Sequence, residues 1–362
     1  MATVASERNP GLHRENLHFE HTRAVGPCVA TPGVAASVGN GASSSSGFRG
    51  DIMLRSLLAD ITSIDAVDVL TLQDSASRTL RLSSRSSLQS VQSEEIIDAI
   101  DHCIDQADAV WPLAPESNGL LEAISERTIQ RNKILLGSTG GAVRATTSKY
   151  STALALHAND VPVVPTYRAQ MPLPPDSQGW VVKPDDGAGC SDTHIFLHSK
   201  AAVEWVAARE HGDYVLQPYI TGRPCSLSLL CRDGEVLLMA CNDQRVAVSD
   251  NQFHYMGSIV NSFDDADGKL KSLALRVLAT IPGLWGYVGI DFIVTEQGPV
   301  VLEVNPRMTV SHVGLHASLG VNPIQIMLDS INDNKRSIPI RSRNRQISVD
   351  IGARQSNRHV VE

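Results

Sequence analysis

Two strand-like segments within residues 286–306 most strongly constrain how this chain folds. Both are rich in branched side chains and flank a Gly-containing turn, a pattern typical of a β-hairpin. Side chains alternate along a strand, so Glu303 and Asn305 lie on one face, which Asp291 reaches from the neighbouring strand. Two close carboxylates repel by about 4 kcal/mol at an effective dielectric near 20, so a divalent cation is needed between them. The hairpin therefore predicts a Mg²⁺ site, in which Mn²⁺ would substitute.

Arg307 lies two residues beyond the last of these ligands. Its planar, forked cation suits a transferring phosphoryl group or an acyl phosphate, which predicts a catalytic role. An alternative interpretation stays open, in which the acids are exposed and precede a turn-forming Asn-Pro.

A second motif, residues 182–191, is a strand that ends in Lys183 and runs into a loop of small residues. The small residues are Gly187, Ala188 and Gly189. They allow backbone N–H groups to approach an anion closely, while Lys183 supplies a point charge for phosphate. Neither the P-loop pattern nor GxGxxG is present. The motif predicts phosphate binding under a lid at residues 185–192, with an acidic surface turn as the alternative.

The order of helix-like and strand-like segments predicts an α/β (α+β) protein. Helices and strands alternate over residues 51–140, which favours a small open sheet, and strands predominate over residues 141–335. Residues 1–50 include a Gly/Ser-rich stretch and are expected to be a partly mobile segment. Residues 336–362 are expected to form a basic, solvated C-terminal tail.

Composition limits the classes of partner. The 362 residues carry a net charge of -8, which argues against a nucleic-acid partner. No apolar run approaches the roughly 18 residues of a membrane span, and the N-terminal residues lack the apolar stretch of a secretory signal. Six cysteines without a CxxC pair are typical of reduced thiols. We therefore expect a soluble cytoplasmic protein with small-molecule partners and no membrane partner, while homo-oligomerisation stays open.

Together these stretches resemble the ATP-grasp superfamily, in the family's order, over about residues 110–330. The resemblance implies two β-rich subdomains that hold ATP between them, preceded by the small open-sheet domain. It further implies that Lys149 and Lys183 bind the ATP phosphates, with the small-residue loop covering them. Asp291, Glu303 and Asn305 would bind Mg²⁺, and Arg307 would steady an acyl phosphate.

The hinge at residues 216–222 would hold adenine through its backbone. The residues concerned are Gln217, Pro218, Tyr219 and Ile220. The family often places an acid before the first lysine and a glutamate in or just after the hinge, whereas this chain has Ser148, Pro218 and Pro224. These departures put the adenine and ribose contacts in doubt more than the metal contacts.

The resemblance implies an ATP-dependent carboxylate-amine ligase that forms an amide through an acyl phosphate. Local strings at residues 48–58, 113–121, 242–244 and 305–311 are similar to the tyramine-glutamate ligases of methanofuran biosynthesis, a route to a C1-carrier cofactor, and to their bacterial relatives. This similarity implies that the side-chain carboxylate of glutamate is activated and that tyramine or a related amine attacks it. Two alternatives stay open: an ATP-grasp ligase that joins other amino acids, and a nucleotide-binding regulatory protein without turnover.

Several polar residues outside these motifs are candidate substrate contacts. Glu116 follows a strand and could bind an ammonium group, although capping the next helix is an equal alternative. The other candidates are Gln244, Arg245, Ser311 and His312. His312 and His316 are four residues apart, but no third ligand accompanies them, which disfavours a metal pair.

Overall fold

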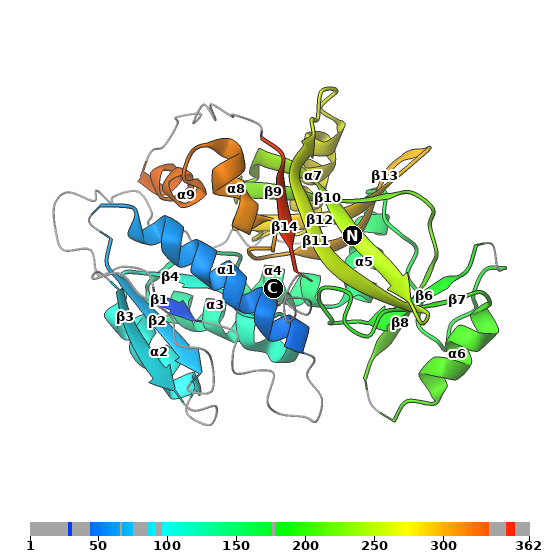
Figure 1. Cartoon of the computed structure of the whole chain (residues 1–362). Coiled ribbons are helices and arrows are strands. Elements are labelled where there is room, and N and C mark those ends of the chain that lie inside the picture. The colour runs from blue at the N-terminus through cyan, green and yellow to red at the C-terminus, as the bar shows by residue number, and fades with distance from the viewer. Residues whose placement is uncertain are drawn as a thin grey trace, which may run out of the picture.

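The computed structural model describes residues 28–30, 44–65, 67–74, 86–91, 96–175, 178–210, 212–332 and 345–351. These residues form a small and a large β-sheet with helices packed around both (Figure 1). The mixed fold, with its small sheet followed by a strand-rich region, confirms the predicted α/β class.

The smaller sheet has five parallel strands in the order β3-β2-β1-β4-β5. The strands are β1 (Cys28–Ala30), β2 (Val69–Asp74), β3 (Ser86–Val91), β4 (Ala109–Pro112) and β5 (Ile134–Leu135). The helices of this part are α1 (Ser44–Thr62), α2 (Ile96–Gln106) and α3 (Leu120–Gln130), with a short 3₁₀ turn, η2 (Ser117–Gly119).

The larger sheet follows the order β13-β12-β9-β10-β11-β7-β6-β8, and β14 pairs with β11. Its first strands are β6 (Trp180–Pro184), β7 (His194–Phe196), β8 (Tyr214–Pro218), β9 (Arg223–Arg232) and β10 (Glu235–Ser249). The remaining strands are β11 (Gln252–Phe263), β12 (Gly286–Thr295), β13 (Gly298–Asn305) and β14 (Ile347–Asp350). Strand β7 joins β11 through one residue pair, His194 with Gln252.

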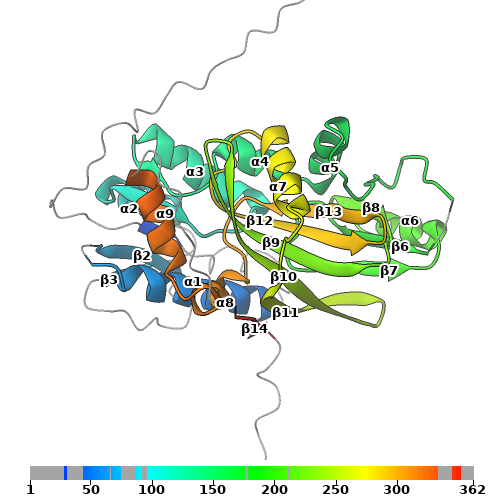
Figure 2. The ribbon, with the colours of Figure 1, turned by 90° about the horizontal axis from the view of Figure 1, so that it is seen from above.

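The helices of the second part are α4 (Gly140–Thr147), α5 (Lys149–Ala158), α6 (Ser199–Ala207), α7 (Lys269–Thr280), α8 (His312–Leu319) and α9 (Pro323–Asn332). Figure 2 shows α4, α5 and α7 along one side of the larger sheet and α1 and α8 along the other. The central strands are therefore covered on both faces.

Strand β9 shows how the sequence produces this two-sided packing. Successive side chains of a strand point to opposite faces. Leu227 and Leu229 accordingly pack with the core beneath α5 and α7, whereas Leu230 packs with the core beneath α1, α8 and α9. A continuous run of small and apolar residues, typical of a strand buried on both faces, therefore occupies the middle of the sheet.

Helix α1 connects the two sheets. Its buried Leu57 belongs to one core cluster with Trp111 of the smaller sheet and Leu230 and Tyr287 of the larger sheet. The helix begins at Ser44, so the predicted boundary at residue 50 falls inside it. Strand β1 also lies within residues 1–50, so this segment contributes a helix and the central strand of the smaller sheet; the mobility expected of its other residues lies outside the described residues.

The C-terminal segment contributes a strand. Within residues 336–362, β14 pairs antiparallel with β11, and Arg245 forms an ion pair with Asp350. Of the basic residues predicted to be solvated, those at positions 335–343 lie outside the described residues, and Arg345 is exposed. Asp233 and Gly234, both with positive φ, join β9 to β10 in a hairpin. No helix within the described ranges is long and apolar enough to cross a membrane.

Replacing Leu57 with alanine tests the connecting role of α1. Leu57 is 0% exposed, so Leu57→Ala is expected to lower the free energy of unfolding by roughly 2–5 kcal/mol, because it leaves a cavity that both sheets border. Denaturant unfolding measures the change. Leu275→Ala, at a leucine that is 38% exposed, is the matched control and should cost under about 0.5 kcal/mol. Equal effects of the two variants would contradict this packing.

Candidate functional site

The predicted acidic hairpin is confirmed in the register of β12 and β13. Asp291 pairs directly with Glu303, and Gly289 pairs with Asn305. Because Asn305 lies two residues beyond Glu303, the three polar side chains share one face of the hairpin. Asp291 also pairs with Ser226 of β9, so this face continues into the buried centre of the sheet.

Electrostatics at this pair suit a divalent cation. Burial, and secondly the charge of Glu303, raise the pKa of Asp291, while a hydrogen bond from Gln244 opposes the shift. Two mutually repelling carboxylates and a neighbouring amide oxygen form a donor set that fits Mg²⁺. Among the described residues no group of three His, Cys, Asp or Glu could hold a metal, and Asn305 as the third ligand stays a prediction.

Two buried lysines face the acidic pair. Lys149, at the start of α5, has its Nζ 3.7 Å from Glu303 Oε2. Lys183 is the last residue but one of β6. Burial lowers its pKa to about 8, although the negative charge of Glu303 opposes this shift. The repulsion of Lys149 contributes to the same lowering. Two cations held close together within a protein suit a polyanionic ligand such as a triphosphate.

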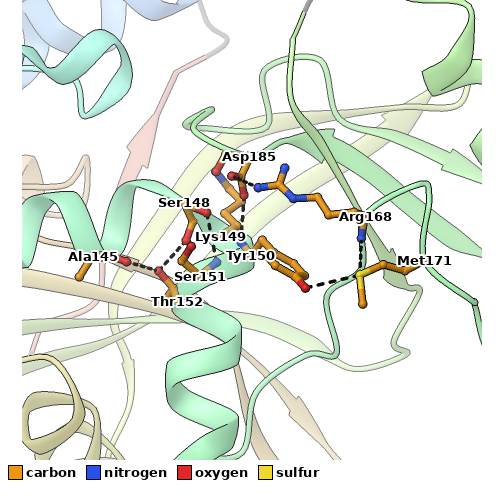
Figure 3. Close-up of polar contacts among 9 residues, drawn as sticks. All are labelled: Ala145, Ser148, Lys149, Tyr150, Ser151, Thr152, Arg168, Met171 and Asp185. Atoms are coloured by element: carbon orange, nitrogen blue, oxygen red, sulfur yellow. Dashed lines mark hydrogen bonds and ion pairs between the residues drawn. The ribbon is translucent and has the colours of Figure 1, made fainter.

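The loop of small residues is fastened at its beginning by Asp185. Its Oδ1 accepts a hydrogen bond from the backbone N–H of Tyr150 at 2.9 Å, and Arg168 Nη2 lies 2.7 Å from Oδ2 (Figure 3). A carboxylate at the first turn of α5 is favoured by the partial positive charge of a helix N-terminus. Arg168 also lies over the Tyr150 ring, with its Cζ 4.9 Å from the ring centroid. Asp185 therefore anchors the loop, rather than forming an exposed acidic turn.

Beyond this anchor the loop backbone approaches the cations. The carbonyl of Gly187 accepts a hydrogen bond from Lys149 Nζ, and Asp185 O accepts one from the same atom at 3.2 Å. Gly187 and Ala188 line a pocket together with Lys149, Glu303 and other residues. The remaining residues that line it are Glu116, Thr146, Thr147, Thr152, Ala153, Leu156, Val163, Asp186, Val301, Leu302, Val304 and Asn305.

Arg307 and Glu116 meet at the edge of this pocket. Arg307 Nη2 lies 2.8 Å from Glu116 Oε2, and the two side chains are 12% and 9% exposed. Arg307 Nε is buried and has no hydrogen-bond partner within the described residues. The side chain of Glu116 makes no capping hydrogen bond to the following turn, so it faces the site instead of capping a helix.

The hinge residues differ in which backbone hydrogen-bonding groups they could provide to adenine. Gln217 is 2% exposed, and its side chain donates to Thr166 Oγ1 at 2.8 Å. Pro218 has no N–H, and the N–H of Tyr219 donates to Gly179 O at 2.8 Å. Adenine contacts at Gln217, Pro218, Tyr219 and Ile220 stay a prediction, which would rely on carbonyl groups and the Ile220 N–H.

The other candidate substrate residues are spread around the site. Gln244 lies beside the predicted metal ligands, since it forms a hydrogen bond to Asp291. Arg245 donates to Val349 O at 2.8 Å, and its contacts tie β10 to β14. Ser311 is 3% exposed and donates to Ser258 Oγ at 3.3 Å.

The two histidines contact helix α1. His312 Nε2 lies 3.2 Å from Asp60 Oδ2, and His316 Nδ1 lies 2.5 Å from Asp60 Oδ1. With one acidic neighbour shared between them, these residues connect α8 to α1. The role of His312 as a substrate contact stays a prediction.

Sequence reasoning missed Arg49, Arg168 and Tyr255. Arg49, on α1, donates to Gly189 O at 2.5 Å, 140 residues away in sequence. Arg168 fastens Asp185, and Tyr255 of β11 interacts electrostatically with Asp291 and Arg49. No local pattern indicated these residues, because each reaches the site through tertiary packing.

Comparison with known proteins agrees with this arrangement. Residues 146–311 match the ATP-grasp domain, and residues 67–143 match the pre ATP-grasp 3 domain. A tyramine–L-glutamate ligase of Methanocaldococcus jannaschii is 23% identical over 304 residues, which cover 83% of this chain and 88% of that protein.

Solved structures share the fold. An L-amino acid ligase from Bacillus licheniformis has a TM-score of 0.66 at 17% identity, covering 89% of this chain and 78% of that one. An ATP-grasp superfamily protein from Archaeoglobus fulgidus has a TM-score of 0.63 at 20% identity, covering 84% of this chain and 88% of that one. The two domain matches, in the order found along the sequence, show that this chain belongs to the ATP-grasp superfamily.

Proposed function

We propose that this protein is an ATP-dependent carboxylate-amine ligase that forms an amide and releases ADP and phosphate. The observation that carries this proposal is the convergence of Lys149 and Lys183 with the Asp291–Glu303 pair, next to Arg307. This arrangement provides cations for phosphates and acids for a metal beside a pocket that Lys149, Glu303 and Asn305 line. ATP and Mg²⁺ are the cofactors that this family uses.

The reaction would proceed in two steps. A carboxylate oxygen of the substrate takes the terminal phosphoryl group of ATP, so the bond to the ADP oxygen breaks and an acyl phosphate forms. The amine nitrogen then attacks the carbonyl carbon, the bond from that carbon to the phosphate oxygen breaks, and the nitrogen loses a proton. No protein nucleophile is required, so the side chains act by positioning and charge stabilisation.

Each residue of the site has a place in this chemistry. Lys149 and Lys183 would hold the phosphates, and Asp291, Glu303 and Asn305 would hold Mg²⁺, which when bound neutralises phosphate charge. Arg307, whose buried Nε–H has no partner among the described residues, would stabilise the acyl phosphate. The small-residue loop, anchored at Asp185, would cover the phosphates and exclude water that hydrolyses the acyl phosphate.

We propose a glutamate carboxylate and the amine of tyramine, or a related amine, as the two substrates. The tyramine–L-glutamate ligase matches over most of both chains support this assignment. The match to an L-amino acid ligase favours an amino acid as a second candidate for the amine.

Turnover with defined substrates tests the proposal. We expect ADP release from Mg-ATP and glutamate to depend on an amine, when a panel that includes tyramine and amino acids is screened. The product should have the mass of the two substrates minus water. ATP binding without ADP release for any pair would contradict the ligase proposal and favour a regulatory nucleotide-binding protein.

Glu303→Gln tests the metal site, since it removes one charged ligand with little change of shape. We expect kcat for ADP release to fall by at least roughly 100-fold, because phosphate charge is no longer balanced. Glu296→Gln, at the exposed turn of the same hairpin, is the matched control and should keep normal turnover. Normal turnover in Glu303→Gln, with folding checked by circular dichroism, would remove the metal argument.

Asp185→Asn tests the anchor of the loop. The variant keeps an acceptor for Tyr150 N–H but loses the ion pair with Arg168, so we expect unfolding to become easier by roughly 1–3 kcal/mol and the KM for ATP to rise. Asp186→Asn, at the exposed neighbouring acid, controls for charge. In the double variant with Arg168→Gln the stability losses should not add, since each change breaks the same pair. Full additivity would show that the two residues act independently.

A further inference from the structure

Arg49 brings helix α1 into contact with the small-residue loop. Its Nη1 donates to Gly189 O at 2.5 Å. A Cβ atom added at Gly189 would lie 2.1 Å from the same Nη1, so the guanidinium packs directly against this glycine. Gly189 has a φ of +61°, a conformation that further favours glycine. The loop and the helix are therefore fitted to one another at this point.

The charges around Arg49 are unbalanced. Arg49 is partly buried, and it interacts electrostatically with Arg307, which makes two guanidinium groups near one another. Arg307 has a carboxylate partner in Glu116, whereas the hydrogen bond of Arg49 within the described residues goes to a neutral carbonyl. Burial, and to a smaller extent the repulsion of Arg307, lower the pKa of Arg49, while Cys190 and Tyr255 oppose the shift.

This imbalance indicates an anion that the described residues do not supply. A guanidinium carries five N–H donors in a planar fork that matches a carboxylate. One N–H of Arg49 is used by Gly189, which leaves others for a ligand. Lys149, which donates to Asp185 O, and Lys183 already provide cations for the phosphates of ATP. The substrate is the remaining source of negative charge.

We propose that Arg49 binds the carboxylate of the acid substrate that is not activated, and so selects a dicarboxylic amino acid. The proposal rests on the ligase function given above. Whichever carboxylate of glutamate takes the phosphoryl group, the other keeps its charge and needs a cation. Because the same guanidinium holds Gly189, binding of that carboxylate is coupled to the position of the loop that covers the phosphates.

The test compares acids that carry one or two carboxylates. Glutamate, 4-aminobutanoate and 2-aminopentanoate are titrated calorimetrically into the protein with a non-hydrolysable Mg-ATP analogue. Arg49→Gln should weaken the binding of glutamate about 10- to 100-fold, as expected when a charge-assisted hydrogen-bonded pair is lost. It should weaken binding of the acid that lacks the carboxylate held by Arg49 by less than about threefold, and it should weaken binding of the ATP analogue less than binding of glutamate.

Two further variants separate binding from structure. Arg49→Lys keeps the charge and should restore part of the glutamate affinity. Arg55→Gln, on the same helix and paired with Asp51, is the matched control and should bind all three acids normally. Thermal unfolding of each variant checks that α1 remains packed.

The possible results have different consequences. The inference would be overturned if Arg49→Gln left the affinity for glutamate unchanged, or if it lowered the affinity for all three acids equally. Weaker binding of the ATP analogue with normal glutamate binding would also overturn it, and would leave Arg49 as a latch for the loop. If the wild-type protein makes no amide from any acid and amine, the ligase proposal itself fails, and this inference fails with it.

Discussion

The site depends on two carboxylates being held side by side although they repel. Asp291 and Glu303 are directly opposite one another in the β12–β13 ladder, so backbone hydrogen bonds fix a separation that the charges alone would increase. The cations gather around this pair: Lys149 pairs with Glu303, and Lys183 is held in its charged form by the same carboxylate despite burial. The rigid hairpin thus holds two carboxylates close together, and their negative charge attracts the two lysines in the absence of a ligand.

Helix α1 gives the site a second support. It packs against both sheets through one core cluster and also supplies Arg49 to the loop. Asp60 of the same helix contacts His312 and His316 on α8. The helix therefore links the region before the ATP-grasp domain to the small-residue loop and to α8, which ties the N-terminal part of the chain to the candidate site.

The sequence predicted the parts of this structure in which chemistry follows local pattern. Period-two spacing was enough to place Glu303 and Asn305 on one face, and the Asp233-Gly234 turn was recognisable because its left-handed conformations favour these residues. The beginning of helix α1 at Ser44 was not predicted, since the Gly/Ser-rich residues before Met53 have low helix propensity. The partners of Asp185 and Gly189 could not be predicted, because they come from Arg168 and Arg49 on other elements. Strand β11 was also missed, because the alternation of polar and apolar residues at its start stops at Met256 and Gly257.

Few backbone pairs join β7 to β11, and this border divides the larger sheet into β6, β7 and β8 on one side and the remaining strands on the other. One ladder pair joins them, supplemented by backbone hydrogen bonds from Ile195 to Asn251 and from Phe253 to Thr193, each 2.8 Å long. The strands β6, β7 and β8 meanwhile share a separate small core around Trp180 and Leu216 with α6. A unit with its own core and few bonds to β11 can rotate about that border, since such a motion breaks little packing there. The junction can therefore serve as a hinge for β6, β7 and β8, while the hydrogen bond between Asp185 and the Tyr150 N–H keeps the beginning of the loop beside α5.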